Sequence, residues 1–316
     1  MQRRTFLAVA SSSLTLKAAP DAKDINGRWD ITVQDDNQKR AWWLEIKGAQ
    51  TAAPSGSFVG APGGNCDPVT DLAIKDGEAR WSFSRPARGN SKAWKNSYKA
   101  LVRDGKLVGT VEVEGEKSVQ WTGVRAPQFH KSDISLMKSG QPIELFNRRD
   151  VSGWRALRDN APMLWKVENG VLKNSAGTTD IVSERKFMDF FMHVEYRVGE
   201  HSNSGIGLRG RYEVQILEDF GKPANTHGNG ALYSRILPTS NASKRAGEWQ
   251  TLDISLAGNT VSVVLNKIKI IDNKEIDGLT AIAIDPNEAE PGPIVLQGDH
   301  GPVEFRRISL TPLLRN

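Results

Sequence analysis

The strongest constraint on the fold is a succession of short extended segments separated by tight turns. Asp-Gly pairs at residues 76–77 and 104–105 mark such turns, because this dipeptide favours the backbone of a β-hairpin. Glycine (29 residues) and tryptophan (9) are plentiful, while 38% of residues are hydrophobic, which suits short strands more than packed helices. We therefore expect an all-β protein. Apolar and polar residues alternate, or nearly so, over residues 27–33, 41–46, 79–83 and 107–113.

The alternation lapses between residues 127 and 142, where Lys, Ser, Gly and Pro mix as they do in linkers. A chain of 316 residues can bury two cores, and strand patterns lie on both sides of this segment. We predict a small β-barrel or β-sandwich over residues 24–126, a linker over 127–142, and a second β domain over 143–316. At least eight strands in the second domain favour a two-sheet jelly-roll sandwich.

The first residues have the features of an export signal. Arg3 and Arg4 precede a short apolar run, and Ala18 and Ala19 offer a cleavage site. The pattern predicts a twin-arginine signal over residues 1–19 and a periplasmic or secreted protein without membrane insertion after cleavage. The alternative is a buried first strand with a basic edge.

Charge and cysteine content exclude some partners. Removal of residues 1–19 takes away three basic residues and no acids, so the formal charge falls from +5 to +5 − 3 = +2. The remaining sequence has no long Lys/Arg run, which argues against a nucleic-acid surface. The single cysteine, Cys66, cannot form an internal disulfide; we interpret it as a small buried hydrophobe, with a reactive thiol as the alternative.

Several motifs of the second domain occur in an order that resembles one known family. The two most specific are Asn-Ser-Gly-Ile-Gly-Leu-Arg-Gly at residues 203–210 and Tyr-Glu-Val-Gln-Ile-Leu at 212–217. Others are Leu-Phe-Asn-Arg-Arg-Asp-Val-Ser-Gly-Trp at 145–154 and Gly-Pro-Ile-Val-Leu-Gln at 292–297. Residues 143–313 thus resemble the 3-keto-disaccharide hydrolase domain family, which implies a concanavalin-like sandwich and a carbohydrate substrate.

This chain departs from the family pattern at a few positions. Glu218 precedes Asp219 where an aspartate is usual, Gln250 and Arg307 replace asparagines, and Lys267 replaces a turn glycine. These departures bear on substrate range more than on fold.

The resemblance implies chemistry at a sugar ketone. A ketone at carbon 3 acidifies the hydrogen on carbon 2, so a base can remove that proton and expel the substituent on carbon 1. This route needs a general base, donors for the developing enolate and an acid for the leaving oxygen. Glu213 is our candidate base. It shares a strand face with Gln215, a candidate hydroxyl ligand, because strand residues two apart point the same way.

Four further positions complete the polar candidates, and one of them, Gln297, is a candidate substrate ligand. Arg209 is a candidate for holding the ketone or enolate oxygen, with a structural salt bridge to Glu213 or Glu195 as the alternative. Asn203, in the same motif, is a candidate substrate ligand or a turn residue. His300 follows Gln297 and Asp299 in a loop and is a candidate acid or ligand, with a solvated loop histidine as the alternative.

Two loop residues and a metal question remain. His227, in a glycine-rich loop, and Tyr233 beside it are candidate sugar contacts. No histidine pair has zinc-ligand spacing on one element, so no cofactor is assigned; a divalent cation is left open, with Asp219, Glu213 and His300 as the residues to check. Trp154 and Trp165 are expected in the core.

The N-terminal domain gains nothing from the resemblance. Its Trp42-Trp43 pair must straddle a strand, so one ring lies in the core and the other is exposed or covered by the second domain. The leading hypothesis is an exported enzyme acting on glycosidic bonds of 3-keto sugars. The alternatives are a noncatalytic concanavalin-like carbohydrate-binding protein, or an N-terminal module that recruits protein partners.

Overall fold

The computed structural model describes most of the chain after the first 24 residues, and the signal and cleavage site predicted over 1–19 lie outside it. In the described part of the chain, no helix is long and apolar enough to cross a membrane. The described residues are 25–34, 41–60, 64–86, 93–114, 117–129, 134–175 and 177–314.

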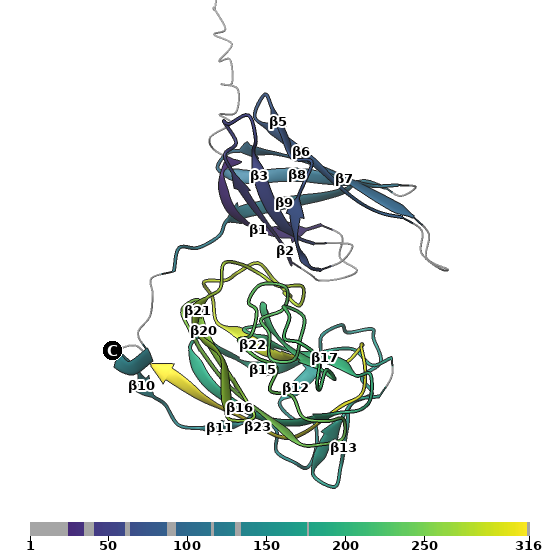
Figure 1. Cartoon of the computed structure of the whole chain (residues 1–316), viewed down its shortest axis with the longest axis vertical. Coiled ribbons are helices and arrows are strands. Elements are labelled where there is room, and N and C mark those ends of the chain that lie inside the picture. Colours follow the sequence, from purple (N-terminus) through teal and green to yellow (C-terminus); the bar gives the residue numbers. More distant parts are fainter. Residues whose placement is uncertain are drawn as a thin grey trace, which may run out of the picture.

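The N-terminal unit is one antiparallel sheet of nine strands that curls on itself (Figure 1). The strand order is β4-β3-β2-β1-β9-β8-β7-β6-β5, and β4 comes into contact with β6, so the sheet is close to a barrel. Its strands are β1 (Gly27–Val33), β2 (Ala41–Lys47), β3 (Ser55–Val59), β4 (Cys66–Val69), β5 (Ala73–Lys75), β6 (Glu78–Arg85), β7 (Trp94–Arg103), β8 (Lys106–Val113) and β9 (Val119–Arg125).

The predicted Asp-Gly turns are present in this sheet. Asp76 and Asp104 both have positive φ angles, of 52° and 51°, and each is followed by a glycine that also has a positive φ. These two turns join β5 to β6 and β7 to β8. Positive φ at both central residues gives the twist that matches paired strands, which explains why this dipeptide could be interpreted from the sequence.

The second unit is a sandwich of two antiparallel sheets. One has nine strands, ordered β13-β14-β23-β16-β19-β20-β21 with β10 and β11 paired to β23, and the other has five, ordered β12-β15-β22-β17-β18. The strands of the larger sheet are β10 (Lys138–Ser139), β11 (Ile143–Glu144), β13 (Lys166–Glu168), β14 (Val171–Lys173), β16 (Phe190–Val198), β19 (Gln250–Ala257), β20 (Thr260–Leu265), β21 (Ile268–Glu275) and β23 (Val303–Leu314). Those of the smaller sheet are β12 (Trp154–Ala156), β15 (Ile181–Phe187), β22 (Gly292–Leu296), β17 (Asn203–Leu208) and β18 (Tyr212–Leu217).

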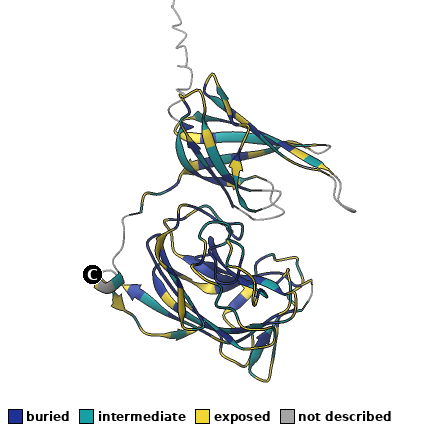
Figure 2. Cartoon of the chain, in the orientation of Figure 1, coloured by how far each residue is buried: buried dark blue, intermediate teal, exposed yellow. Residues whose placement is uncertain are grey.

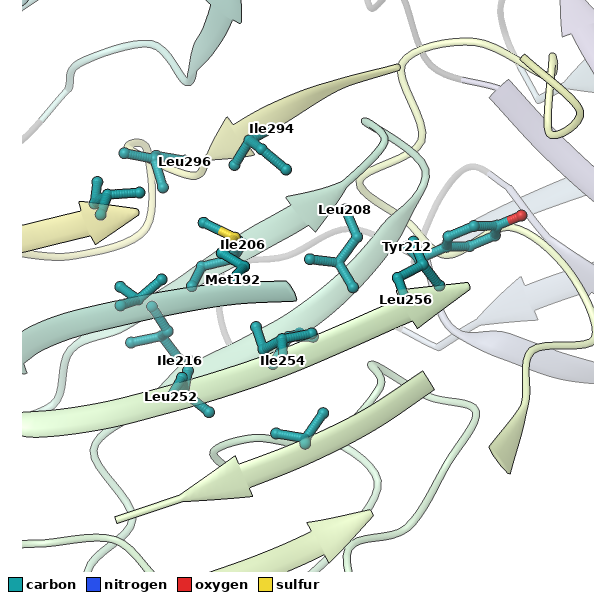
Figure 3. Packing of buried hydrophobic residues seen from close by; sticks show 14 of the residues in the cluster. Met192, Ile206, Leu208, Tyr212, Ile216, Leu252, Ile254, Leu256, Ile294 and Leu296 are labelled. Atoms are coloured by element: carbon teal, nitrogen blue, oxygen red, sulfur yellow. The ribbon is translucent and has the colours of Figure 1, made fainter. Parts of the chain in front are cut away.

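Alternate residues of the facing sheets form the core of the sandwich. Met192, Leu252, Ile254 and Leu256 of the larger sheet meet a row of side chains from the smaller one (Figure 3). Buried positions concentrate between the two sheets (Figure 2). The predicted all-β class, with a jelly-roll sandwich after a small β domain, is confirmed. The row from the smaller sheet comprises Ile206, Leu208, Tyr212, Ile216, Ile294 and Leu296.

The segment predicted as a linker contributes to the second unit. It contains a short 3-10 turn, η2 (Ile134–Leu136), and β10, which pairs with the end of β23. The sandwich therefore begins before the residue at which strand alternation resumes in the sequence.

The two units are packed against each other through β2 and β3. Trp42 lies in the core of the N-terminal sheet, whereas Trp43 is fully buried within the core cluster of the sandwich, together with Val59. The guanidinium of Arg235 lies 4.2 Å from the centre of the Trp43 ring. The expectation that one ring of the pair faces inward and the other is covered by the second domain is confirmed.

The interface leaves no room for additional side-chain atoms at its centre. A Cβ on Gly278 would lie 2.1 Å from the indole nitrogen of Trp43, so this close approach requires glycine. The amide of Ala41 donates a 2.9 Å hydrogen bond to the carbonyl of Ala283. Contacts this close fix the orientation of the N-terminal unit on the sandwich.

Two carboxyl groups meet in this interface. Asp30, on the outer side of β1, is 1% exposed, and Glu288 of the sandwich is 4% exposed. Glu288 also accepts a 2.9 Å hydrogen bond from the Tyr212 hydroxyl. Among the described residues no donor reaches either oxygen of Asp30, and its carboxyl neighbour is Glu288. Burial, and then the charge of Glu288, raises the pKa of Asp30 to about 9, so Asp30 holds the proton that joins the pair.

This pair predicts a pH-dependent stability. The pKa of Asp30 is raised in the folded protein, so the unfolding free energy declines as pH rises from about 4 to about 9. Asp30→Asn keeps a donor toward Glu288 and reduces this slope to the part that Glu288 contributes, because burial also raises the pKa of Glu288. Chemical denaturation at pH 5 and pH 8.5 measures it. Asp104→Asn, an exposed turn substitution in the same unit, is the control and keeps the wild-type slope; an equal slope in Asp30→Asn would contradict the assignment.

Candidate active site

The smaller sheet turns its polar residues away from the core. On β18, Tyr212, Val214 and Ile216 are core residues, so the intervening Glu213 and Gln215 point to the opposite face. Both are nevertheless buried, at 3% and 2% exposure. The two residues therefore lie under chain segments that cover this face.

Glycines on β17 make room for Glu213. In the ladder between β17 and β18, Gly205 pairs with Gln215 and Gly207 with Glu213. A Cβ on Gly205 would stand 2.4 Å from Oε1 of Glu213, so any other residue would displace the carboxyl group. The glycine pattern of the 203–210 motif thus forms the floor on which Glu213 lies.

Polar side chains on the same face carry unused hydrogen-bonding capacity. Gln215 donates from Nε2 to Oδ1 of Asn203 at 2.8 Å. Its own Oε1, like Oε1 of Gln297, is buried and accepts no hydrogen bond from any described residue. Buried polar atoms without partners are costly, so these two oxygens indicate a ligand with hydroxyl groups.

The loop after β18 brings Tyr233 and His227 to Glu213. The Tyr233 amide donates a 2.9 Å hydrogen bond to the Glu213 carbonyl. The rings of His227 and Tyr233 are in edge contact at 4.8 Å, and the buried Nε2 of His227 has no partner among the described residues. Burial, then the charges of Glu213 and Asp67, raises the pKa of Tyr233, so its hydroxyl keeps its proton.

His300 and Tyr233 come from opposite flanks of Glu213 within the same sheet. His300 follows β22, which is separated from β18 by β17, whereas Tyr233 belongs to the segment that is hydrogen-bonded along the opposite edge of β18. Nδ1 of His300 is hydrogen-bonded to Asp299. That hydrogen bond, together with the charges of Asp299 and Glu213, raises the pKa of His300 against the opposing effect of burial.

Arg209 does not join this cluster, and its expected role is corrected. Its guanidinium is fully buried in an ion pair with Asp189 at 3.1 Å and donates to the carbonyls of Met188 and Gly258. These contacts tie the β17–β18 turn to neighbouring segments. The ion pair of Arg209 is thus with Asp189, and not with the Glu213 or Glu195 that the sequence suggested.

Asp219 does not join it either. Its carboxylate accepts hydrogen bonds from the Asn229 amide at 2.9 Å and the Ser243 hydroxyl at 2.6 Å, which fixes the loop after β18. Within the described ranges, no three His, Cys, Asp or Glu side chains are grouped closely enough to hold a metal ion. The proposed check on Asp219, Glu213 and His300 thus finds no common site for them.

The tryptophans behave as expected. Trp154 and Trp165 are each 5% exposed, and their indole nitrogens donate to the carbonyls of Leu145 and Thr179. They are core residues, and Tyr233, which is half-buried, remains the aromatic side chain beside the polar cluster.

A separate groove of about 830 Å³ lies on the outer face of the larger sheet. Its ionisable residues are paired with one another: His193 with Asp253, and Lys269 with Asp272. Both aspartates are more than half exposed, unlike Glu213. The residues that line the groove include no buried acid or base, whereas Glu213 is buried, so Glu213 remains the candidate for acid–base chemistry.

The sequence interpretation missed two supporting residues. Thr280 accepts a 2.9 Å hydrogen bond from the Glu213 amide, and Asn65 of the N-terminal unit accepts one from the Tyr233 hydroxyl at 3.2 Å. Both lie more than sixty residues from their partner, and no local pattern marks them. Asp299 is different, because its position next to His300 was visible in the sequence.

The arrangement is that of a β-sandwich with a buried carboxyl group, a histidine and a tyrosine on one sheet face. Residues 141–311 match the family described as the 3-keto-alpha-glucoside-1,2-lyase-like domain, which is more than half of the chain. The chain belongs to this family.

Individual relatives are more distant. A 3-keto-disaccharide hydrolase of Bacteroides thetaiotaomicron is 24% identical over 155 residues, covering 38% of this chain and 53% of the relative, so the match spans about half of that protein's length. A solved structure of a proposed glycosyl hydrolase from Parabacteroides distasonis is 27% identical, with a TM-score of 0.48 over 58% of this chain and 93% of that one. An endo-β-1,3(4)-glucanase of family GH16 is 11% identical, with a TM-score of 0.37 over 59% and 95%.

The cluster predicts how the ionisation of His300 responds to its neighbours. Asp299→Asn lowers the pKa of His300 most, because the hydrogen bond that Asp299 accepts is the largest cause of the raised pKa, and Glu213→Gln lowers it by less. NMR titration of the imidazole signals measures both. Asp253→Asn, at the partner of His193, is the control and leaves His300 unchanged. A His300 pKa that is the same in wild type and Glu213→Gln would show that the Glu213 charge does not act on His300, and would contradict a shared site.

Proposed function

We propose that the chain is a glycoside-processing enzyme that cleaves 3-keto-disaccharides or related 3-keto-glycosides, with Glu213 as the general base. The observation that carries the proposal is a buried carboxyl group on a glycine floor, flanked by His300 and Tyr233. Membership of a family described by 3-keto-α-glucoside lyase chemistry supports the substrate class.

The proposed reaction begins with proton transfer. The Glu213 carboxylate takes the proton on carbon 2, and the electron pair of that C–H bond forms the enolate of the carbon 3 ketone. The enolate then expels the oxygen on carbon 1, giving an unsaturated keto sugar and the leaving group. Addition of water returns a proton to carbon 2 and places a hydroxyl on carbon 1, so the net reaction is hydrolysis.

His300 is the proposed acid for the leaving oxygen. Its pKa is raised chiefly by the hydrogen bond with Asp299, so a larger fraction is imidazolium near neutral pH than for an unperturbed histidine. Asp299 holds Nδ1, which leaves Nε2 as the donor toward substrate. Protonation of the leaving group accordingly weakens as pH rises through the pKa of His300.

Tyr233 is the proposed donor to the ketone oxygen. It flanks Glu213 on the side opposite His300, as carbon 3 and carbon 1 flank carbon 2 in the sugar. A neutral phenol can donate a hydrogen bond that strengthens as negative charge develops on the enolate oxygen. The free oxygens of Gln215 and Gln297 would accept from sugar hydroxyls, with Asn203 and His227 at the margin.

A noncatalytic carbohydrate-binding protein gains less support. Such proteins stack sugars on exposed aromatic platforms, and in the described part of the chain the exposed large hydrophobic side chains include Phe191 and Phe220 but no tryptophan or tyrosine. A base buried beside a glycine floor has no evident use in binding alone.

We also propose that the protein is exported by the twin-arginine route and works in the periplasm or outside the cell. The paired Arg3 and Arg4 and the Ala18-Ala19 site support this. Substitution of both arginines by lysine is expected to retain the full-length precursor in the cytoplasm; unchanged export and cleavage would contradict the proposal.

The activity is tested by turnover of a 3-keto-disaccharide beside its unoxidised parent. The wild-type protein is expected to cleave only the keto sugar, and Glu213→Gln to lower kcat by at least about 100-fold, because a positioned general base contributes about that much or more. Glu184→Gln, at an exposed carboxylate on β15 of the same sheet, is the control and keeps wild-type activity. Equal activity in Glu213→Gln, or equal cleavage of the parent sugar, would refute the mechanism. Saturable binding without turnover would favour the carbohydrate-binding alternative.

A further inference from the structure

The N-terminal unit reaches the candidate active site through one short segment. β3 and β4 lie next to β2, whose Trp43 is buried in the sandwich, so the segment before β4 is held against the loop after β18. A Cβ on Gly64 would stand 2.7 Å from Cβ of Ala281. The backbone of the two units is thus in close contact immediately beside Asn65.

Two polar contacts join this segment to the Tyr233 loop. The Cys66 amide donates a 2.9 Å hydrogen bond to the Ser234 hydroxyl, and the Tyr233 hydroxyl donates one to Oδ1 of Asn65 at 3.2 Å. Cys66 is partly buried at this contact, where burial raises the pKa of its thiol. The N-terminal unit therefore contacts both Tyr233 and Ser234.

The Tyr233 loop has backbone strain that these contacts hold in place. Ser234 has a φ of 57°, in the left-handed region that residues other than glycine seldom occupy. Its amide donates a 2.8 Å hydrogen bond to the Thr226 carbonyl, and its hydroxyl accepts one from the Cys66 amide. Such conformations persist where surrounding contacts enforce them, and they concentrate at functional sites.

We infer that the N-terminal unit is part of the active site, where Asn65 acts as a positioning residue for the hydroxyl of Tyr233. The inference rests on the proposed function. Asn65 is half-buried and its Nδ2 donates to no described residue, so the amide retains a donor as well as the acceptor that Tyr233 uses. When the single phenol proton turns to the ketone oxygen of the substrate, the Asn65 amide turns as well, so that its Nδ2 donates to the phenol oxygen and holds it in place.

This role makes the N-terminal unit necessary for turnover as well as for stability. The phenol stays neutral because burial, and then the Glu213 and Asp67 charges, raise its pKa, so its contribution depends on the direction in which it donates. Asn65 supplies that direction from a residue outside the matched domain.

The test is a double-mutant cycle between Asn65→Ala and Tyr233→Phe in the full-length mature protein, with a 3-keto-disaccharide as substrate. Asn65→Ala is expected to lower kcat about tenfold, as for the loss of one hydrogen bond, and to leave KM nearly unchanged. In the Tyr233→Phe background the same substitution is expected to have no further effect. Arg28→Gln is the control, because it removes a different hydrogen bond between the units, from Arg28 to the Asp277 carbonyl, and is expected to keep wild-type kcat.

The outcomes separate this inference from the proposed function. Wild-type kcat in Asn65→Ala, or additive losses in the double mutant, would overturn the role of Asn65 while the activity stands. An equal loss in Arg28→Gln would show that docking in general, and not Asn65, matters. A wild-type protein that turns over no 3-keto-glycoside would refute the proposed function, and this inference with it.

Discussion

The candidate site depends on how the smaller sheet of the sandwich accommodates one buried carboxyl group, that of Glu213. Glu213 lies on a strand whose alternate residues, Tyr212, Val214 and Ile216, face the core, and it fits on the opposite face because Gly205 has no side chain at the point of contact. Burying a carboxyl group is costly unless its surroundings serve it. Here the surroundings are His300, Tyr233 and two glutamine side-chain oxygens that accept no hydrogen bond from a described residue. Fold and chemistry meet at this position, because the glycine of β17 that leaves room for the carboxyl group also forms the floor of the candidate site.

The second constraint is the packing of the N-terminal unit. The ring of Trp43, on β2 of the N-terminal sheet, packs into the core of the sandwich, and Gly278 allows the ring to approach. This packing buries Asp30 against Glu288 and places Asn65 at Tyr233. The same interface thus links stability to pH and an accessory sheet to the candidate site. A domain without its own catalytic motif can contribute to catalysis when its orientation is fixed in this way.

Local pattern and chemistry explain what the sequence could predict. The Asp-Gly turns at residues 76–77 and 104–105, the alternating strands and the Trp42-Trp43 pair follow from periodicities of two and from turn geometry. The position of Glu213 beside Gln215 follows from the same periodicity. Arg209 was misplaced because its partner, Asp189, comes from a distant turn, and a buried guanidinium pairs with whichever carboxylate the fold supplies. Asn65, Thr280 and the Asp30–Glu288 pair depend on contacts between remote segments, which spacing along the chain does not encode.

The central claim is that cleavage begins with removal of the proton on carbon 2. Hydrolysis of a 3-keto-disaccharide in D₂O, sampled early and compared with substrate incubated without protein, tests it directly by NMR of the released keto sugar. The account predicts deuterium at carbon 2 of that product, because the water that adds to the unsaturated intermediate supplies the new hydrogen. A product that keeps its original hydrogen at carbon 2 would show direct displacement at carbon 1 and would contradict the role proposed for Glu213.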